Sequence, residues 1–303
     1  MLSAIFAHLM NKGSKFLNWI ILAILSIIWG TSFILIKKGL ESFSSFQVGS
    51  LRILITFLFL LPVALRNIKK INRENLRSLL IIGFIGSGFP AILYPLAQTH
   101  LDSSVAGMLN SLTPVFTLLL GVSFYSRKVN KRQVAGLVLG FIGAAGLIYN
   151  GSFSFNAYGL LIVLATSFYG ISSNQVALVK GMNGLTITSL AFLFIGPLAG
   201  ISLIFTDFNA AMETENFLRN LAFVGILAVF GTGIALAIFN VLILRTSPIF
   251  GSSVTYLIPI VAVLWGISDE ESIKSFMIIS VICILAGVYL INIKATPKKD
   301  RRE

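Results

Sequence analysis

Two basic side chains, Lys37 and Arg52, lie in otherwise apolar stretches of the sequence. A guanidinium is a planar pair of donors that suits a carboxylate or phosphate, and an ammonium adds a point charge. Ionisable groups are costly in hydrocarbon, so each suggests a functional role. We expect Lys37 and Arg52 to attract or hold an anionic group of a solute. In the alternative, Lys37 extends to the membrane surface, and Arg52 pairs with Glu41 or with helix-end carbonyls.

Neutral polar and aromatic residues accompany these cations in the stretches that should surround a central cavity. Pro114 and Pro259 follow two such groups, and a proline frees the carbonyl one turn earlier, so we expect both to bend their helices beside the cavity. The alternative is that Ser, Thr and Asn only join helices, as in any bundle. The candidate solute contacts besides Lys37 and Arg52 are Trp29, Ser32, Gln98, Asn110, Ser111, Tyr169, Ser173, Asn174, Asn240, Thr255 and Tyr256. Thr113 and Ser172 belong to the same polar groups.

Groups for catalysis and energy coupling are scarce. No Asp or Glu falls well inside an apolar stretch, and the chain has two His and one Cys, Cys283. Little is left for nucleophilic, metal or acid–base chemistry, so we expect no enzyme, metal or cofactor. There is no phosphate-binding loop for ATP. The missing membrane carboxylate favours a facilitator or exchanger over a proton-coupled carrier.

The elements that position these residues are membrane helices. The 303 residues have a mean hydropathy of +0.92 and are 11% charged, whereas soluble domains are about 25% charged. A span needs roughly 20 apolar residues. The net charge of +12 lies in short loops and a basic tail, so it does not indicate nucleic-acid binding. We predict ten spans, near residues 17–37, 47–66, 76–98, 103–124, 132–149, 157–177, 184–206, 217–243, 247–267 and 275–293.

The positive residues predict the orientation of these spans. With an even number of spans and both termini in the cytoplasm, most of the 23 Lys and Arg residues fall on the inner side, as the positive-inside rule requires. Only Lys37, Lys38, Arg219 and Lys274 fall outside, and Arg52 falls within a span. We therefore expect a multi-pass protein of the cell's inner (plasma) membrane.

The two halves of the chain share several features. Pro62 and Pro197, and Pro114 and Pro259, occupy related places, and LAILSIIWG at 22–30 resembles LIVLATSFYG at 161–170. We predict an all-α membrane protein with two five-helix repeats, 17–149 and 157–293, and a basic cytoplasmic tail, 294–303. Because five is odd, the second repeat enters the membrane inverted. Transporters of this kind bind solutes at the interface between repeats.

The segment Ile28 to Arg52, IWGTSFILIKKGLESFSSFQVGSLR, resembles the opening of EamA-type proteins of the drug/metabolite transporter superfamily. Ser247 to Glu271, SPIFGSSVTYLIPIVAVLWGISDEE, is similar to that family's proline-centred span and the acidic residue after it. The first half lacks this acid and has Phe124, Tyr125 and Ser126 in its place. The resemblance implies ten helices in inverted halves, a central solute cavity and, often, export of amino acids or other metabolites.

We therefore predict a transporter of small organic solutes, with amino acids or related metabolites as the expected cargo and export as the expected direction. A multidrug exporter of lipophilic cations is the alternative, which the basic Arg52 and the absence of an acid disfavour. The glycines of residues 136–146 permit close helix contact. We expect that contact within a monomer, with a homodimer as the alternative.

Overall fold

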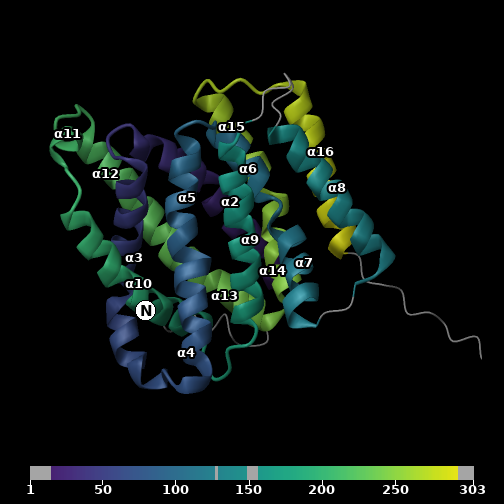
Figure 1. The fold of residues 1–303 in the computed structure, drawn as a ribbon, viewed down its shortest axis with the longest axis horizontal. Coiled ribbons are helices and arrows are strands. Elements are labelled where there is room, and N and C mark those ends of the chain that lie inside the picture. Colours follow the sequence, from purple (N-terminus) through teal and green to yellow (C-terminus); the bar gives the residue numbers. More distant parts are fainter. Residues whose placement is uncertain (1–14, 127–128, 149–155, 293–303) are drawn as a thin grey trace, which may run out of the picture.

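The computed structural model describes residues 15–126, 129–148 and 156–292, and this part of the chain is a bundle of helices without a β-strand (Figure 1). The predicted tail, 294–303, lies outside the described residues. The helices are α2 Lys15–Leu40, α3 Ser45–Asn67, α4 Arg73–Leu80, α5 Phe89–Gln98, α6 Ser103–Asn110, α7 Thr113–Tyr125, α8 Lys131–Ile148, α9 Tyr158–Val176, α10 Gly184–Ile204, α11 Asn209–Met212, α12 Phe217–Ile226, α13 Ala235–Arg245, α14 Pro248–Ser252, α15 Ile258–Ser268 and α16 Ser275–Asn292.

Nine of the described helices are long and apolar enough to cross a membrane. Several consist of consecutive segments, such as Arg73–Gln98 and Phe217–Arg245. The helix α9 is 19 residues long but is not among the nine. It carries the polar run Ser172–Gln175 near its end, which lowers its hydropathy. The structure thus confirms an all-helical membrane protein, and the count of ten spans stays a prediction.

Short irregular segments interrupt three of these helices and end a fourth. Two wide π-helical turns, η2 Ile81–Gly88 and η3 Leu227–Ile234, join α4 to α5 and α12 to α13. Two 3₁₀ turns, η1 Ile68–Lys70 and η4 Ser253–Tyr256, follow α3 and α14. A π turn leaves backbone carbonyls without their usual helical partners, and such turns are frequent at functional sites.

Local capping sets where several helices begin. The hydroxyl of Ser44 accepts from the backbone N–H of Gln47, whose side chain accepts in turn from the N–H of Ser44. Asn72 and Asn75 form the same reciprocal cap at the start of α4. These caps satisfy backbone donors that have no partner within the helix.

Helices from both halves pack against one another throughout the bundle. The helix α3 packs on α10, α7 on α9, α2 on α15, and α8 on α16. In the last pair, a side chain added at Gly136 or Gly143 would meet the backbone of α16. The glycines therefore permit a close contact within this chain.

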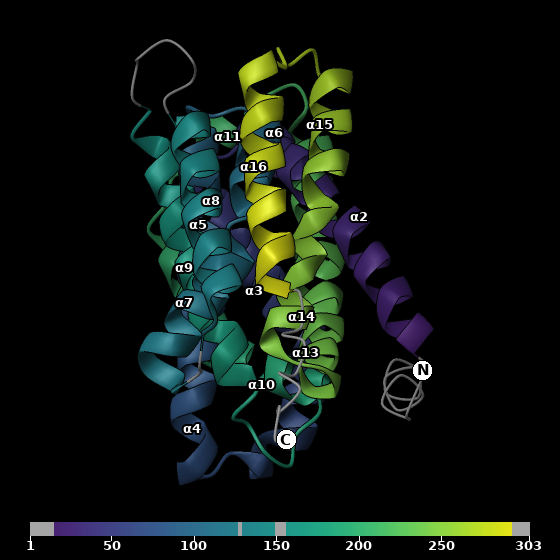
Figure 2. The same cartoon turned by 90° about the vertical axis from the view of Figure 1, so that its right-hand side faces the viewer.

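The helices of the bundle begin and finish at two opposite ends. We call the end with the α5–α6 and α15–α16 loops the Lys37 end, because α2 finishes there. The helix α4 begins at the opposite end, and α16 runs from the Lys37 end toward it (Figure 2). The helix α2 also begins toward the end where α4 begins (Figure 2).

Candidate functional site

A cavity lies at the centre of the bundle, between segments of both halves. It encloses about 1030 Å³ of space free of protein atoms, part of it open to solvent. The first half contributes residues of α2, α3, η2, α5, α6 and α7, and the second half contributes residues of α9, α10, η3, α13, α14 and η4. Among the described residues that line the cavity, Arg52 is the one charged side chain.

The cavity brings together eight of the thirteen predicted solute contacts. Thr113 and Ser172, which belong to the same polar groups, line it as well. These residues come from helices that are distant in sequence, so their proximity depends on the fold. The eight are Trp29, Ser32, Arg52, Asn110, Tyr169, Ser173, Asn240 and Thr255.

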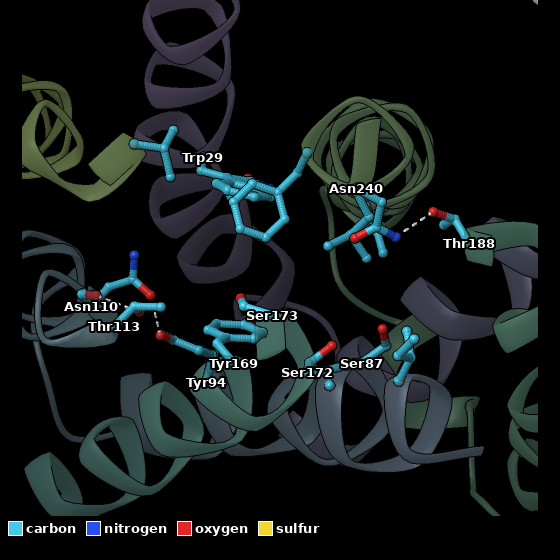
Figure 3. A pocket seen from close by; sticks show the side chains of 18 of the residues that line it. Trp29, Ser87, Tyr94, Asn110, Thr113, Tyr169, Ser172, Ser173, Thr188 and Asn240 are labelled. Carbon is cyan, nitrogen blue, oxygen red and sulfur yellow. Dashed lines mark hydrogen bonds between the residues drawn. The ribbon is translucent and has the colours of Figure 1, made fainter. Parts of the chain in front are cut away.

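Aromatic rings form two facing walls of the cavity. Trp29 meets Phe239 edge to face, with ring centroids 5.0 Å apart. Tyr94 and Tyr169 stack at 5.9 Å. Trp29 lies across the cavity from the two tyrosines, with Asn110 toward one side and Asn240 toward the other (Figure 3). The space between these walls suits an apolar or flat part of a solute.

Arg52 lies on α3 with 8% of its surface exposed. Its Nε donates a hydrogen bond to the Thr232 hydroxyl at 2.6 Å. That hydroxyl donates in turn to the carbonyl of Leu227 in the π turn η3. No ion pair to Arg52 occurs within the part of the chain that the structure describes. The expected alternative partner, Glu41, binds Lys38 instead.

The π turn η3 is held by donors from the first half. The indole Nε1 of Trp29 donates to the carbonyl of Gly231 at 2.9 Å. The Thr56 hydroxyl lies 2.8 Å from the carbonyl of Ala228. These side chains satisfy carbonyls of the wide turn and fix Thr232 beside Arg52.

Two pairs of neutral polar side chains in the cavity bond one another. The Tyr94 hydroxyl donates to Asn110 Oδ1 at 2.5 Å. Asn240 donates to the Thr188 hydroxyl at 3.0 Å (Figure 3). An amide that already has one partner keeps further capacity for a solute.

Four other predicted contacts join helices instead of lining the cavity. Gln98 donates to the carbonyl of Phe33, and Ser111 donates to that of Thr255. Asn174 donates to Thr117 and Gly170 carbonyls. The Tyr256 hydroxyl accepts from Asn292.

Lys37, the remaining predicted contact, lies in a group of ionised side chains at the Lys37 end. We call Lys37, Lys38, Glu41, Asp269 and Glu271 the charge cluster. Lys37 Nζ lies 2.7 Å from Asp269 Oδ2 and 2.8 Å from Glu271 Oε1. Lys38 Nζ lies 2.9 Å from Glu41 Oε1 and 2.7 Å from Asp269 Oδ1. The structure therefore pairs Lys37 with carboxylates of the second half.

Glu271 is the buried member of the charge cluster, with 2% of its side chain exposed. It accepts from the backbone N–H groups of Ser103 and Ser104, at the start of α6. Burial alone would raise the pKa of the Glu271 carboxyl, but bonds from Lys37 and the two serines outweigh it and lower the pKa. Asp269 likewise has a lowered pKa, because bonds from Lys37 and Lys38 outweigh its desolvation. Both carboxylates are therefore held in the ionised form.

Pro114 and Pro259 each interrupt a helix. Each is the second residue of a new helix, α7 or α15, after a break that follows the cavity residues Asn110 and Thr255. Proline suits the first turn of a helix because its missing donor has no partner there. The predicted bends are therefore breaks between helix segments.

Sequence reasoning missed several residues that line the cavity. One signal was available for two of them. Ser87 in η2 and Thr232 in η3 each lie between two glycines, in the segments IGSGF and FGTGI, at related places in the two halves. Tyr94, Thr188 and Ser252 stand out less in the sequence. The missed polar residues are Ser87, Tyr94, Thr188, Thr232 and Ser252.

A bundle of apolar helices around a central polar and aromatic cavity defines an integral membrane protein of the solute-transporter class. The chain belongs to the EamA-like transporter family, whose model matches residues 17–149 and 155–293. This assignment indicates a transporter rather than an enzyme. It agrees with the resemblance of residues 28–52 and 247–271.

Named relatives support this class. The chain is 27% identical over 290 residues to the uncharacterized inner membrane transporter YedA of Escherichia coli (strain K12), which covers 89% of this chain and 91% of YedA. It is 27% identical over 148 residues to a probable amino-acid metabolite efflux pump of Salmonella typhimurium, which covers 47% of each chain. One crystal structure has a TM-score of 0.64 at 15% identity, covering 92% of this chain and 97% of that chain, and shares the fold.

Proposed function

We propose that this chain exports small organic solutes, amino acids or related metabolites, by alternating access between two inverted five-helix repeats. The observation that carries the proposal is the central cavity, which has walls from both halves. A site at such an interface can be exposed to either side of the membrane as one half moves against the other.

Corresponding irregularities in the two halves support the inverted repeat. The π turns η2 and η3 interrupt the third predicted span of each half, and the helix breaks at Pro114 and Pro259 interrupt the fourth. The family model also matches each half separately. An odd number of spans in a half would give the second half the opposite orientation.

Labelling of introduced cysteines tests this arrangement. In a Cys283→Ser background, we expect a membrane-impermeant maleimide to label Glu213→Cys from outside the cell and Lys180→Cys only after the cytoplasmic face is exposed. Both positions are exposed in the structure. Labelling of both from the same side would contradict inverted halves with cytoplasmic termini.

The charge cluster supports a closed gate at the Lys37 end. It joins α2 and α6 of the first half to the loop after α15 in the second half. Opening this end for alternating access would separate Lys37 from Asp269 and Glu271. We therefore assign the cluster the role of an outer gate.

The type of solute is supported by the cavity and by one relative. The Salmonella typhimurium relative is named as a probable amino-acid metabolite efflux pump. Export of lipophilic cations is the alternative, and the aromatic walls would suit such molecules. The described lining has a cation and no acidic residue, which opposes cation binding.

Transport by purified protein in proteoliposomes tests the function. We expect saturable movement of amino acids or organic anions, without a requirement for a pH gradient, and loss of that movement in Arg52→Ala. Arg66→Ala is the matched control, since Arg66 is an exposed arginine at the other end of the same helix. Movement of cationic dyes alone, unaffected by Arg52→Ala, would favour the multidrug alternative.

We also propose that the working unit is a monomer. The glycines of α8 are used in packing on α16, which supports this. The homodimer stays the alternative.

A further inference from the structure

The charge of Arg52 has no compensating carboxylate among the residues that the structure describes. Its Nε has one bond, to the hydroxyl of Thr232. The two terminal nitrogens of a guanidinium carry four further N–H donors, and arginine does not lose its proton in proteins. In the described part of the chain no hydrogen bond uses these donors, although the side chain is buried.

An anion stabilises a buried guanidinium of this kind. Water alone solvates it poorly in a narrow apolar space, and a carboxylate matches its donors two at a time. In the charge cluster, by contrast, every lysine has carboxylate partners. The cavity is thus a place where a mobile anion supplies the missing partner.

The described lining of the cavity offers an ammonium group no ionised partner, because it contains no Asp or Glu. An ammonium group would also lie in the positive field of Arg52, so a zwitterion gains less than an anion of the same shape.

The aromatic rings that line the cavity indicate the chemistry of the rest of the solute. Trp29 lies across the space from Tyr94 and Tyr169 (Figure 3), and Phe239 packs on Trp29. Such ring faces favour contact with an aromatic ring of a solute, and Arg52 lines the same cavity.

We propose that the preferred solute is an organic monoanion, with a carboxylate paired to Arg52 and an aromatic body between the two ring pairs. This proposal rests on the transport function proposed above and makes it more specific. A zwitterionic amino acid is then a weaker substrate than the acid that lacks its amino group.

A matched series of probes with one aromatic body tests the charge preference. The series is 3-phenylpropionate, phenylalanine and 2-phenylethylamine, which are an anion, a zwitterion and a cation at neutral pH. The compound 2-phenylethanesulfonate is added, because it stays ionised and does not cross lipid as a neutral acid. Calorimetry on the detergent-solubilised full chain measures binding, and counterflow in proteoliposomes measures transport.

We expect both anions to bind about tenfold or more tightly than phenylalanine and the amine. Arg52→Gln should remove this preference, Arg52→Lys should retain part of it, and Arg66→Gln should leave it unchanged. Elution of each variant at the wild-type volume in size-exclusion chromatography controls for folding. Arg52→Lys keeps the positive charge but loses the planar guanidinium. It therefore separates recognition of the charge from recognition through the guanidinium geometry.

The outcomes distinguish this inference from the proposed function. Transport with a preference for phenylalanine or the amine would overturn the inference and leave a transporter. Anion binding without counterflow would support the anion site and contradict transport. Absence of saturable binding by either anion, or equal binding to wild type and Arg52→Gln, would overturn the anion site.

Discussion

Lys37 and Arg52 are both cations of the first half, but they differ in the partners that the protein gives them. Lys37 has two carboxylate partners within 2.8 Å, and these come from the second half. Arg52 is more deeply buried, and within the described part of the chain its one hydrogen-bond partner is a hydroxyl. The comparison shows that position in an apolar segment does not determine whether the protein supplies the opposite charge to a cation.

This difference gives the two regions different effects on stability. The charge cluster joins the halves and satisfies both α6 backbone donors and Lys37. The cavity gives Arg52 no carboxylate partner among the described residues, which costs stability. Binding sites are often less stable than the protein around them for this reason.

The largest effect is expected in the charge cluster. Glu271→Ala removes a buried carboxylate and leaves Lys37 and two backbone N–H groups with fewer acceptors. We expect a loss of about 3 kcal/mol, or roughly 6 °C in melting temperature, as for breaking a buried ion pair. Thermal melts in detergent measure it. Glu270→Ala is the neighbouring control, and equal losses in the two variants would contradict a special role for Glu271.

An opposite and smaller effect is expected in the cavity. Arg52→Met removes a buried charge that has no carboxylate partner and keeps much of the side-chain volume. We expect stability to rise by about 1–2 kcal/mol while anion binding is lost. Melting in detergent without added solute measures this. A fall in melting temperature would show that Arg52 has a structural partner.

The smallest effect concerns pH. The pKa values of Glu271 and Asp269 are lowered in the folded protein, so their contribution is complete above the ordinary carboxyl range, near pH 4, and is lost as the pH falls through the lowered pKa values. Asp102 has the opposite sign, since burial and the nearby Glu271 raise its pKa, and its protonation as the pH falls relieves repulsion.

Melting temperature should therefore hold or rise slightly as the pH falls from 7 toward the ordinary carboxyl range, near pH 4, and fall below that range. The fall should be smaller in Glu271→Gln, which cannot titrate at that position. A steady decline from pH 7 downward would contradict this assignment of groups.

Much of the fold could be predicted from the sequence, because hydropathy determines membrane helices directly. The predicted stretch 217–243 corresponds to the observed helix Phe217–Arg245, and 103–124 corresponds to Ser103–Tyr125. The π turns were not foreseen, since their apolar composition resembles that of an ordinary helix. Their paired glycines are the one local sign.

The residues of the candidate site were harder to predict from the sequence. Asn174 and Asn240 are both buried polar residues in apolar helices, yet only Asn240 lines the cavity. The direction in which each points depends on how neighbouring helices pack. Likewise, nothing near Lys37 in the sequence shows that it meets Glu271, which lies 234 residues further along the chain.

Affinity for 3-phenylpropionate in Lys37→Gln and Arg52→Gln, measured by calorimetry beside wild type, tests the central contrast most directly. Both variants lose one positive charge, so long-range electrostatics changes similarly in each. We predict that Arg52→Gln weakens binding about tenfold or more and that Lys37→Gln changes it by less than about threefold. Equal weakening in both variants, or greater weakening in Lys37→Gln, would contradict the account.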